Sequence, residues 1–177
     1  MRVYALLAVI LSVALLLGCQ PAEWKTVHLC QKADACAGPP PSGDWACDIA
    51  GKDALFGYDP SGPTFIFQAV GSVPNPLTEY VVVYYPDPWP GEGLICLSDP
   101  VTSGEDGSIT VEGNIAIYTD LPISTDANLT DGAKIWLVPK DMVDCANHKM
   151  ANWNDCPGIL FEQDINYRVF YTYVPNP

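Results

Sequence analysis

Residues 63 to 177 contain a series of short segments rich in β-branched and aromatic residues, each bounded by turn-forming residues. The strongest is 79–85 (EYVVVYY), which is apolar at nearly every position and therefore typical of a central strand covered on both faces. Further strands are expected at 64–70, 93–98, 108–111, 114–119, 133–138 and 166–174. About eight short strands without intervening helices predict an all-β, antiparallel two-sheet sandwich.

Two turns divide this series. Residues 86–91 (PDPWPG) carry three prolines, which lack the N–H groups that a strand ladder needs, and 103–108 (SGEDGS) form the second turn. The Asp106–Gly107 turn resembles turns of immunoglobulin-like and prealbumin-like modules. Through the segments 84–91 and 131–136, residues 63–177 as a whole are similar to uncharacterised archaeal and bacterial surface lipoproteins. That resemblance implies a sandwich at the cell surface and carries no known activity.

The first eighteen residues predict a signal peptide. Arg2 follows the initiator, residues 3–17 are apolar but too few to span a bilayer, and the small Gly18 precedes Cys19. Residues 16–19 (LLGC) resemble the lipobox of prolipoproteins, which implies cleavage before Cys19 and acylation of its sulfur. We therefore expect a lipid-anchored protein on a cell membrane or outer membrane, facing away from the cytoplasm. The alternative is an ordinary signal peptide or uncleaved anchor, with Cys19 a spare thiol.

Charge excludes one class of partner. Removing residues 1–18 leaves 177 − 18 = 159 residues, enough for one domain with a substantial core. All 21 acidic residues remain but only 7 of the 8 basic ones, so the net charge becomes 7 − 21 = −14. Nucleic acid requires the opposite sign. Anionic lipid headgroups are repelled as well, so acyl chains on Cys19 would provide the contact with a membrane.

Cysteine usage agrees with export. Without Cys19, six cysteines remain, an even number that predicts three disulfides. The spacing weakly favours a Cys36–Cys47 bridge around the proline-rich stretch 38–43. Residues 19–62 have few aliphatic side chains after an expected strand at 24–29, so we expect a Cys/Pro-rich extension stapled to a sandwich domain at 63–177. The six cysteines are Cys30, Cys36, Cys47, Cys96, Cys145 and Cys156.

Catalytic and copper chemistry find little support. Cys145, His148 and Met150 resemble the ligand loop of blue-copper proteins, but the second imidazole would have to come from His28. Cys145 also has Cys156 eleven residues on, and a bridged sulfur cannot bind copper. A catalytic triad would depend on one of the same two histidines, without a G-x-S-x-G motif. We expect no enzyme, with an envelope-bound hydrolase as the alternative.

One acidic loop carries oxygen ligands that suit calcium: Asp120, Asp126, Asn128 and Asp131. Their spacing is not that of an EF-hand, because Asp131 stands where glycine is required. We expect no cofactor, with calcium in this loop as the alternative. The competing interpretation is that Asp, Asn and Gly simply form turns. Asn128-Leu129-Thr130 also fits an N-glycosylation acceptor.

Tryptophans suggest a binding surface. Aromatic faces stack on sugar rings, yet strand tryptophans usually belong to the core, which we expect for Trp136. Trp89, in the proline-rich turn, is the better surface candidate. The sequence thus favours a lipid-anchored, extracytoplasmic, non-catalytic module that binds envelope glycans or surface proteins. The alternatives are the hydrolase, a calcium-stabilised glycan-binding module, and a structural subunit that exposes a large complementary patch or a long unpaired edge strand.

Overall fold

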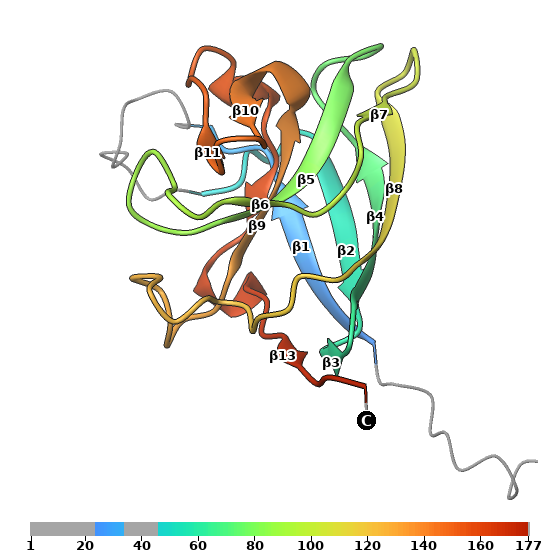
Figure 1. Ribbon diagram of the computed structural model, residues 1–177. Helices are drawn as coiled ribbons and strands as arrows, with labels where there is room; N and C mark the ends of the chain where they lie inside the picture. The colour runs from blue at the N-terminus through green and yellow to red at the C-terminus, as the bar shows by residue number, and fades with distance from the viewer. Residues whose placement is uncertain (1–23, 34–45, 177) are drawn as a thin grey trace, which may run out of the picture.

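Two β-sheets face each other across an apolar core in the computed structural model of the chain (Figure 1). The structure describes residues 24–33 and 46–176. The strand pairs of both sheets are antiparallel, so the all-β antiparallel fold class is confirmed. Whether the sandwich is of the immunoglobulin-like or prealbumin-like type stays a prediction. The signal peptide, Cys19 and Cys36 lie outside the described residues.

The larger sheet has five strands, in the order β12 (Phe161–Glu162), β1 (Lys25–Cys30), β2 (Asp53–Tyr58), β4 (Phe65–Ser72) and β8 (Ser108–Ile115). The expected strand near 24–29 is confirmed as β1. The boundary expected at residue 62 needs correction, because β1 and β2 lie inside this sheet and are not an extension beside it. They belong there because alternate side chains of both strands, such as Leu29 and Phe56, are buried in the core.

The smaller sheet is built around β5 (Glu79–Tyr85), the segment that the sequence singles out. It pairs with β9 (Lys134–Pro139) on one side, and with β6 (Ile95–Cys96) and β7 (Val101–Thr102) on the other. Tyr80, Val82 and Tyr84 point into the core between the sheets, whereas Val81, Val83 and Tyr85 pack into a second apolar cluster on the opposite face. The prediction that this strand is covered on both faces is therefore confirmed.

The remaining elements are short. They are β3 (Ser61–Gly62), η1 (Lys140–Met142), β10 (Val143–Asp144), β11 (Lys149–Met150), η2 (Cys156–Gly158), η3 (Ile165–Tyr167) and β13 (Thr172–Tyr173). Two predicted strands, 93–98 and 166–174, reduce to the two-residue strands β6 and β13. The two strands predicted at 108–111 and 114–119 are one strand, β8, which ends at Ile115.

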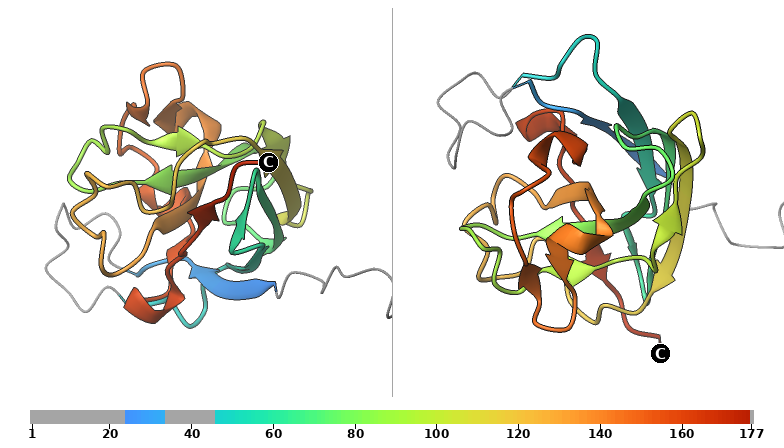
Figure 2. Two further views of the ribbon diagram at one scale, coloured as in Figure 1. Left: turned by 60° about the horizontal axis from the view of Figure 1, so that its bottom comes forward. Right: turned by 90° about the horizontal axis from the view of Figure 1, so that it is seen from above.

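The two long sides of the sandwich differ. On one side, Leu160 pairs with Leu137 of β9 and the next residues form β12, which pairs with β1, so this segment joins the two sheets. On the other side, β8 borders the larger sheet, and it pairs with β4 alone among the described strands. Figure 2 shows β8 at this border from two further directions.

Disulfides connect the sheets to their loops. Cys30 is bonded to Cys47 and Cys96 to Cys145. The predicted Cys36–Cys47 disulfide is therefore wrong. The backbones of Lys32 and Cys47 pair antiparallel just beyond β1, and this pairing brings Cys47 close to Cys30. Cys145 is bridged as expected, but to Cys96 rather than to the nearby Cys156. Cys156 is itself disulfide-bonded.

Candidate functional site

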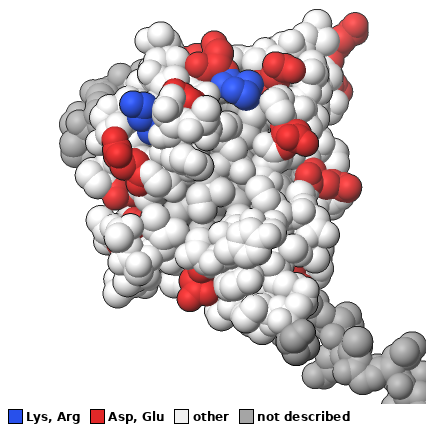
Figure 3. Space-filling view, in the orientation of Figure 1, with Lys and Arg blue, Asp and Glu red and all other residues white. Residues whose placement is uncertain are grey.

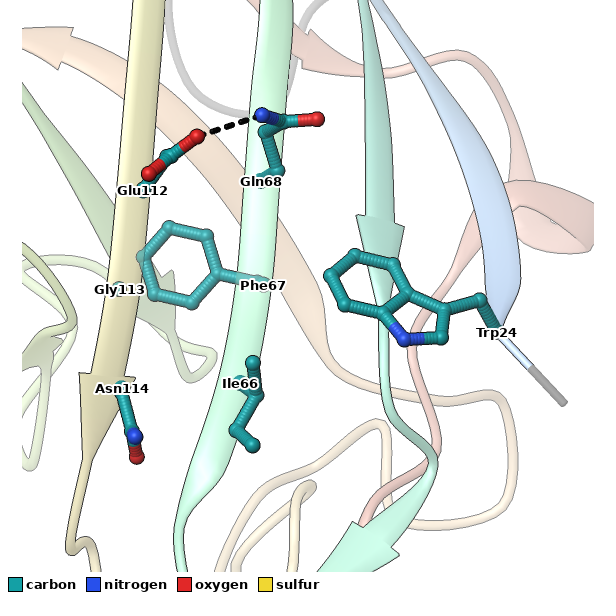
Figure 4. A pocket seen from close by; sticks show the side chains of 7 residues that line it. All are labelled: Trp24, Ile66, Phe67, Gln68, Glu112, Gly113 and Asn114. Carbon is teal, nitrogen blue, oxygen red and sulfur yellow. Dashed lines mark hydrogen bonds between the residues drawn. The ribbon is translucent and has the colours of Figure 1, made fainter. Parts of the chain in front are cut away.

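A shallow groove of about 430 Å³ lies on the outer face of the larger sheet, away from the core (Figure 4). Strand alternation builds this face. In β4, Phe65, Phe67 and Ala69 are buried while the residues between them are at least partly exposed, and β8 follows the same period of two. The residues that line the groove are Trp24, Ile66, Phe67, Gln68, Glu112, Gly113 and Asn114.

A row of residues crosses the outer face of the neighbouring strands and enters the groove at Gln68 and Glu112. Thr26 is opposite Gly57, Gly57 opposite Gln68, and Gln68 opposite Glu112. Because Gly57 has no side chain, the row is hollow at β2.

Trp24 occupies this hollow. A Cβ atom added to Gly57 would lie 3.1 Å from Cε3 and 3.3 Å from Cζ3 of the Trp24 indole, so the six-membered ring rests on the glycine. The residue is still 49% exposed. The indole is thus supported from below and open to solvent on its other side.

Hydrogen-bonding groups line the same groove as the indole, on β4 and β8 (Figure 4). The Gln68 side chain donates from Nε2 to Oε1 of Glu112 over 2.6 Å, which fixes both groups on neighbouring strands. Asn114 lies two residues further along β8 and is exposed. Together they present amide donors, amide acceptors and a carboxylate beside an aromatic face. This combination suits a ligand with an apolar face and polar edges.

The uncovered sheet face continues beyond the groove. Leu55 of β2 and Val70 of β4 are opposite each other and are 51% and 45% exposed. Apolar side chains at these outward positions are unusual for a strand face turned to water. They enlarge the surface that a ligand or partner would cover.

Sequence reasoning placed Trp24 in a strand but did not identify it as a surface group. A tryptophan at the entry of an alternating strand is the signal that was available. Its exposure depends on Gly57, thirty-three residues away in the chain, which only the register of β1 and β2 reveals.

Trp89, the expected surface candidate, is indeed exposed, at 41%. Its ring contacts Trp153 edge-on at 5.4 Å between centroids, and Trp153 in turn packs against Trp136 and Phe161. Trp136 is buried, as expected. Trp89 is therefore the outermost ring of an aromatic cluster on the opposite sheet, and it does not line the groove of Trp24.

The acidic loop is held by protein donors. Asp126 is buried; it accepts hydrogen bonds from the Tyr84 hydroxyl and from the backbone N–H of Asn128, the latter over 2.8 Å. Asp120 accepts from the backbone N–H of Tyr173 instead. Asp131 Oδ2 lies 3.7 Å from Nη1 of Arg168. Within the described part of the chain, three or more His, Cys, Asp or Glu side chains nowhere gather to hold a metal ion.

Asp87 connects this loop to the proline-rich turn. Its Oδ2 accepts hydrogen bonds from Nδ2 of Asn128 and from Nζ of Lys134. Burial alone would raise the pKa of Asp87, but these two donors outweigh it and hold the pKa below its usual range. The carboxylates of the loop thus meet cations and amides of this chain, which supports the turn-forming interpretation of the loop.

The amide of Asn128 is fully used. Nδ2 donates to Asp87 and to Asp126, and Oδ1 accepts from Arg168. N-glycosylation replaces one hydrogen on this nitrogen, so a glycan on Asn128 would break at least one of these bonds. The folded loop therefore argues against the acceptor site that the sequence pattern suggests.

The two histidines lie apart in the fold. His28 is on the outer side of β1, with Nε2 at 3.7 Å from Oδ2 of Asp53, and His148 contacts the carbonyl oxygen of Leu94 through Nδ1. The copper ligand set that the sequence already disfavoured is not assembled, because Cys145 is bridged to Cys96 and Met150 is buried in the second cluster. No helix among the described residues has the length and apolar character needed to cross a membrane.

Comparison of the chain with protein-family models, with curated proteins and with solved structures found no match.

Proposed function

We propose that this chain is a lipid-anchored, extracytoplasmic surface protein and that it acts as a non-catalytic binding module. The signal-peptide pattern and the lipobox-like residues before Cys19 support this cellular location. Disulfides such as Cys96–Cys145 support it independently, since they persist in oxidising compartments outside the cytoplasm.

The ligand class that the groove favours is a saccharide. The observation that carries this proposal is the exposed Trp24 indole, seated on Gly57 beside the hydrogen-bonded Gln68–Glu112 pair. One sugar ring would stack on the indole while its hydroxyl groups exchange hydrogen bonds with the amide and the carboxylate. A supported ring loses little conformational entropy on binding, which favours affinity.

The charge of the groove narrows the class of saccharide that it can bind. Glu112 is the ionisable side chain among the lining residues, and acidic residues outnumber basic ones by 21 to 8 in the full sequence. Uronate and sulfated polymers would be repelled. Neutral or amino-sugar polymers of a cell envelope are the expected ligands.

The test compares two tryptophans of similar exposure. The oxidised protein is titrated with neutral, amino-sugar and uronate polysaccharides, and binding is followed by tryptophan fluorescence and by the melting temperature. We expect Trp24→Ala to weaken binding roughly tenfold, or about 1–2 kcal/mol, while Trp89→Ala changes it little. Equal saccharide binding by the wild type and by Trp24→Ala would disprove the proposal that the Trp24 groove is the binding site. Loss only in Trp89→Ala would move the site to the aromatic cluster.

A second variant tests the support that Gly57 gives to the Trp24 indole, rather than the indole itself. Gly57→Ala places a methyl group 3.1 Å from the indole, which must shift by a few tenths of an ångström from its position over Gly57. Binding should fall although every ligand-contacting side chain is retained. Thr26→Ala, the neighbour in the same row, is the matched control and should bind as wild type does.

The membrane anchor is tested separately. Mass spectrometry of the mature protein should find an acylated N-terminal Cys19, and Cys19→Ser should release the protein from the membrane fraction. Calcium is tested in the same melts, because stabilisation reversed by EDTA would restore the calcium alternative.

A further inference from the structure

The border strand β8 is long, regular and open. It pairs with β4 through eight successive residue pairs, from Ser108 opposite Ser72 to Ile115 opposite Phe65, without an inserted residue. On its other side, the backbone of 109–115 has no hydrogen-bonded partner among the described residues. This is the free edge of the larger sheet in Figures 1 and 2.

The alternation of the ladder identifies the outward groups. The backbone N–H of Val73 donates to the carbonyl oxygen of Gly107, which continues the β4–β8 register by one pair. Hydrogen-bonded and non-hydrogen-bonded residue pairs alternate in an antiparallel ladder. The odd-numbered residues of β8 therefore direct their backbone N–H and C=O groups toward β4. Thr110, Glu112 and Asn114 therefore point their N–H and C=O groups away from the sheet.

Several usual protections of a free edge are missing. Segment 108–115 (SITVEGNI) has no proline, no lysine and no bulge, three devices that discourage a border strand from pairing with another chain, and Glu112 is its one charged side chain. The opposite side of the sandwich is closed by Leu160 and β12, so this opening is specific to the β8 side.

A second groove, of about 490 Å³, runs beside this edge. Residues Leu97–Pro100, which connect β6 to β7, form one wall, and residues Glu112–Ile115 of β8 form another. An added strand would lie in this space, with every second side chain turned into the groove.

Charge decides whether a second copy of this chain or a segment of another protein pairs with the edge of β8. Glu112 lies near the middle of the strand and Asp99 on the facing wall, with Lys140 as the one cation among the lining residues. Acidic side chains also mark the side of the molecule on which β7 and β8 run in Figure 3. Two copies joined through β8 would bring two Glu112 carboxylates together at a net charge of −13 each for the full chain.

We propose that β8 accepts an extended, basic peptide segment of a partner protein as a sixth strand of the larger sheet. The partner supplies backbone hydrogen bonds to Thr110, Glu112 and Asn114, and its Lys or Arg side chains face the acidic groups. The proposal does not depend on saccharide binding in the Trp24 groove.

The probe is a capped eight-residue peptide of alternating lysine and valine, with two controls. One control carries N-methyl groups on all of its backbone amides, so that neither edge can donate hydrogen bonds, and the other replaces lysine by glutamate. Amide hydrogen exchange of the oxidised protein is followed residue by residue. At ten times the peptide's Kd, exchange at Thr110, Glu112 and Asn114 should slow about tenfold. The N-methylated peptide should have no effect, and the glutamate peptide should bind at least tenfold more weakly.

Protein variants supply the matched pair. Thr110→Pro removes one outward N–H at a border position that tolerates proline, whereas Thr110→Val keeps it. Peptide binding should be lost in the first and retained in the second. Thr110 does not line the Trp24 groove, so both variants should keep saccharide binding, and Trp24→Ala should keep peptide binding.

Three results would overturn the proposal. These are unchanged exchange at the three amides, equal binding of the N-methylated peptide, and concentration-dependent dimerisation that itself protects the three amides without peptide. Should Thr110→Pro fail to fold, the N-methylated peptide decides the question on the wild-type protein.

Discussion

The ring of Phe67 occupies the space that a side chain on Gly113 would need. The two residues are opposite each other on β4 and β8, and a Cβ atom on Gly113 would lie 2.1 Å from Cε1 and 2.4 Å from Cζ of the ring. Figure 4 shows the ring extending over the glycine. Phe67 is buried and stacks on Phe56 at 5.2 Å, so it has no room to withdraw. The glycine is thus a packing requirement of the core.

Gly113→Ala should therefore destabilise the fold by about 2 kcal/mol or more, because the methyl group overpacks a filled core. Denaturant unfolding at constant slope measures the loss. Phe67→Leu, which shortens the opposing side chain, should reduce the effect of Gly113→Ala in the double variant. Simple additivity of the two substitutions would show that the ring and the glycine do not compete for space.

The same pair shows where the sequence is insufficient. The sequence predicts two strands, 108–111 and 114–119, separated at Glu112-Gly113. In the structure the strand continues through Gly113, and the ring of Phe67 covers the glycine. The strands β5 and β9 were predictable, since each is an uninterrupted apolar run. The strand β2 was not, because its outward residues include Gly57 and its charged first residue Asp53, which are typical of loops.

The Cys96–Cys145 disulfide should contribute more stability than Cys30–Cys47. The first closes a loop with a sequence separation of 49 and the second one of 17. Chain-entropy estimates give about 4 and about 3 kcal/mol for loops of these lengths. Paired Cys→Ser variants, compared by chemical unfolding, should preserve this order. A larger loss from the Cys30–Cys47 pair would indicate that native contacts, not loop length, set the difference.

The acidic loop shows a second limit of sequence reasoning. The clustering of Asp and Asn was visible in the sequence, and calcium binding was the alternative to turn formation that their residue types suggested. Their partners, however, come from far along the chain: Tyr84 binds Asp126, and Arg168 binds Asn128. Only the fold brings these donors to the loop.

Asp87→Asn should destabilise the protein by about 1–3 kcal/mol at neutral pH, because it removes the charged acceptor of Lys134 and Asn128. The pKa of Asp87 is lowered in the fold, so its contribution is present above the unfolded value near 3.9 and is lost as pH falls through the folded value. Wild type and variant should therefore converge in stability at acid pH. Glu105→Gln, in an exposed turn, is the control. A difference that persists unchanged to pH 2 would contradict this role.

Glu162 should show the opposite pH dependence. Its carboxyl group is buried and accepts a hydrogen bond from the indole N–H of Trp136 over 2.5 Å. Burial raises its pKa, against the charge of Lys134 and the bond from Trp136.

Because the folded pKa lies above the unfolded value near 4.3, the folded state binds the proton more tightly. This contribution is complete below pH 4 and is lost as pH rises through the folded pKa. Glu162→Gln has no charge to bury, so its free energy of unfolding, relative to wild type, should rise as pH increases from about 4 through the folded pKa of Glu162. Urea unfolding at half-unit pH steps measures the difference, with Glu79→Gln at the exposed start of β5 as the control. A difference that stays constant over this range would mean that Glu162 titrates alike in the folded and unfolded chains.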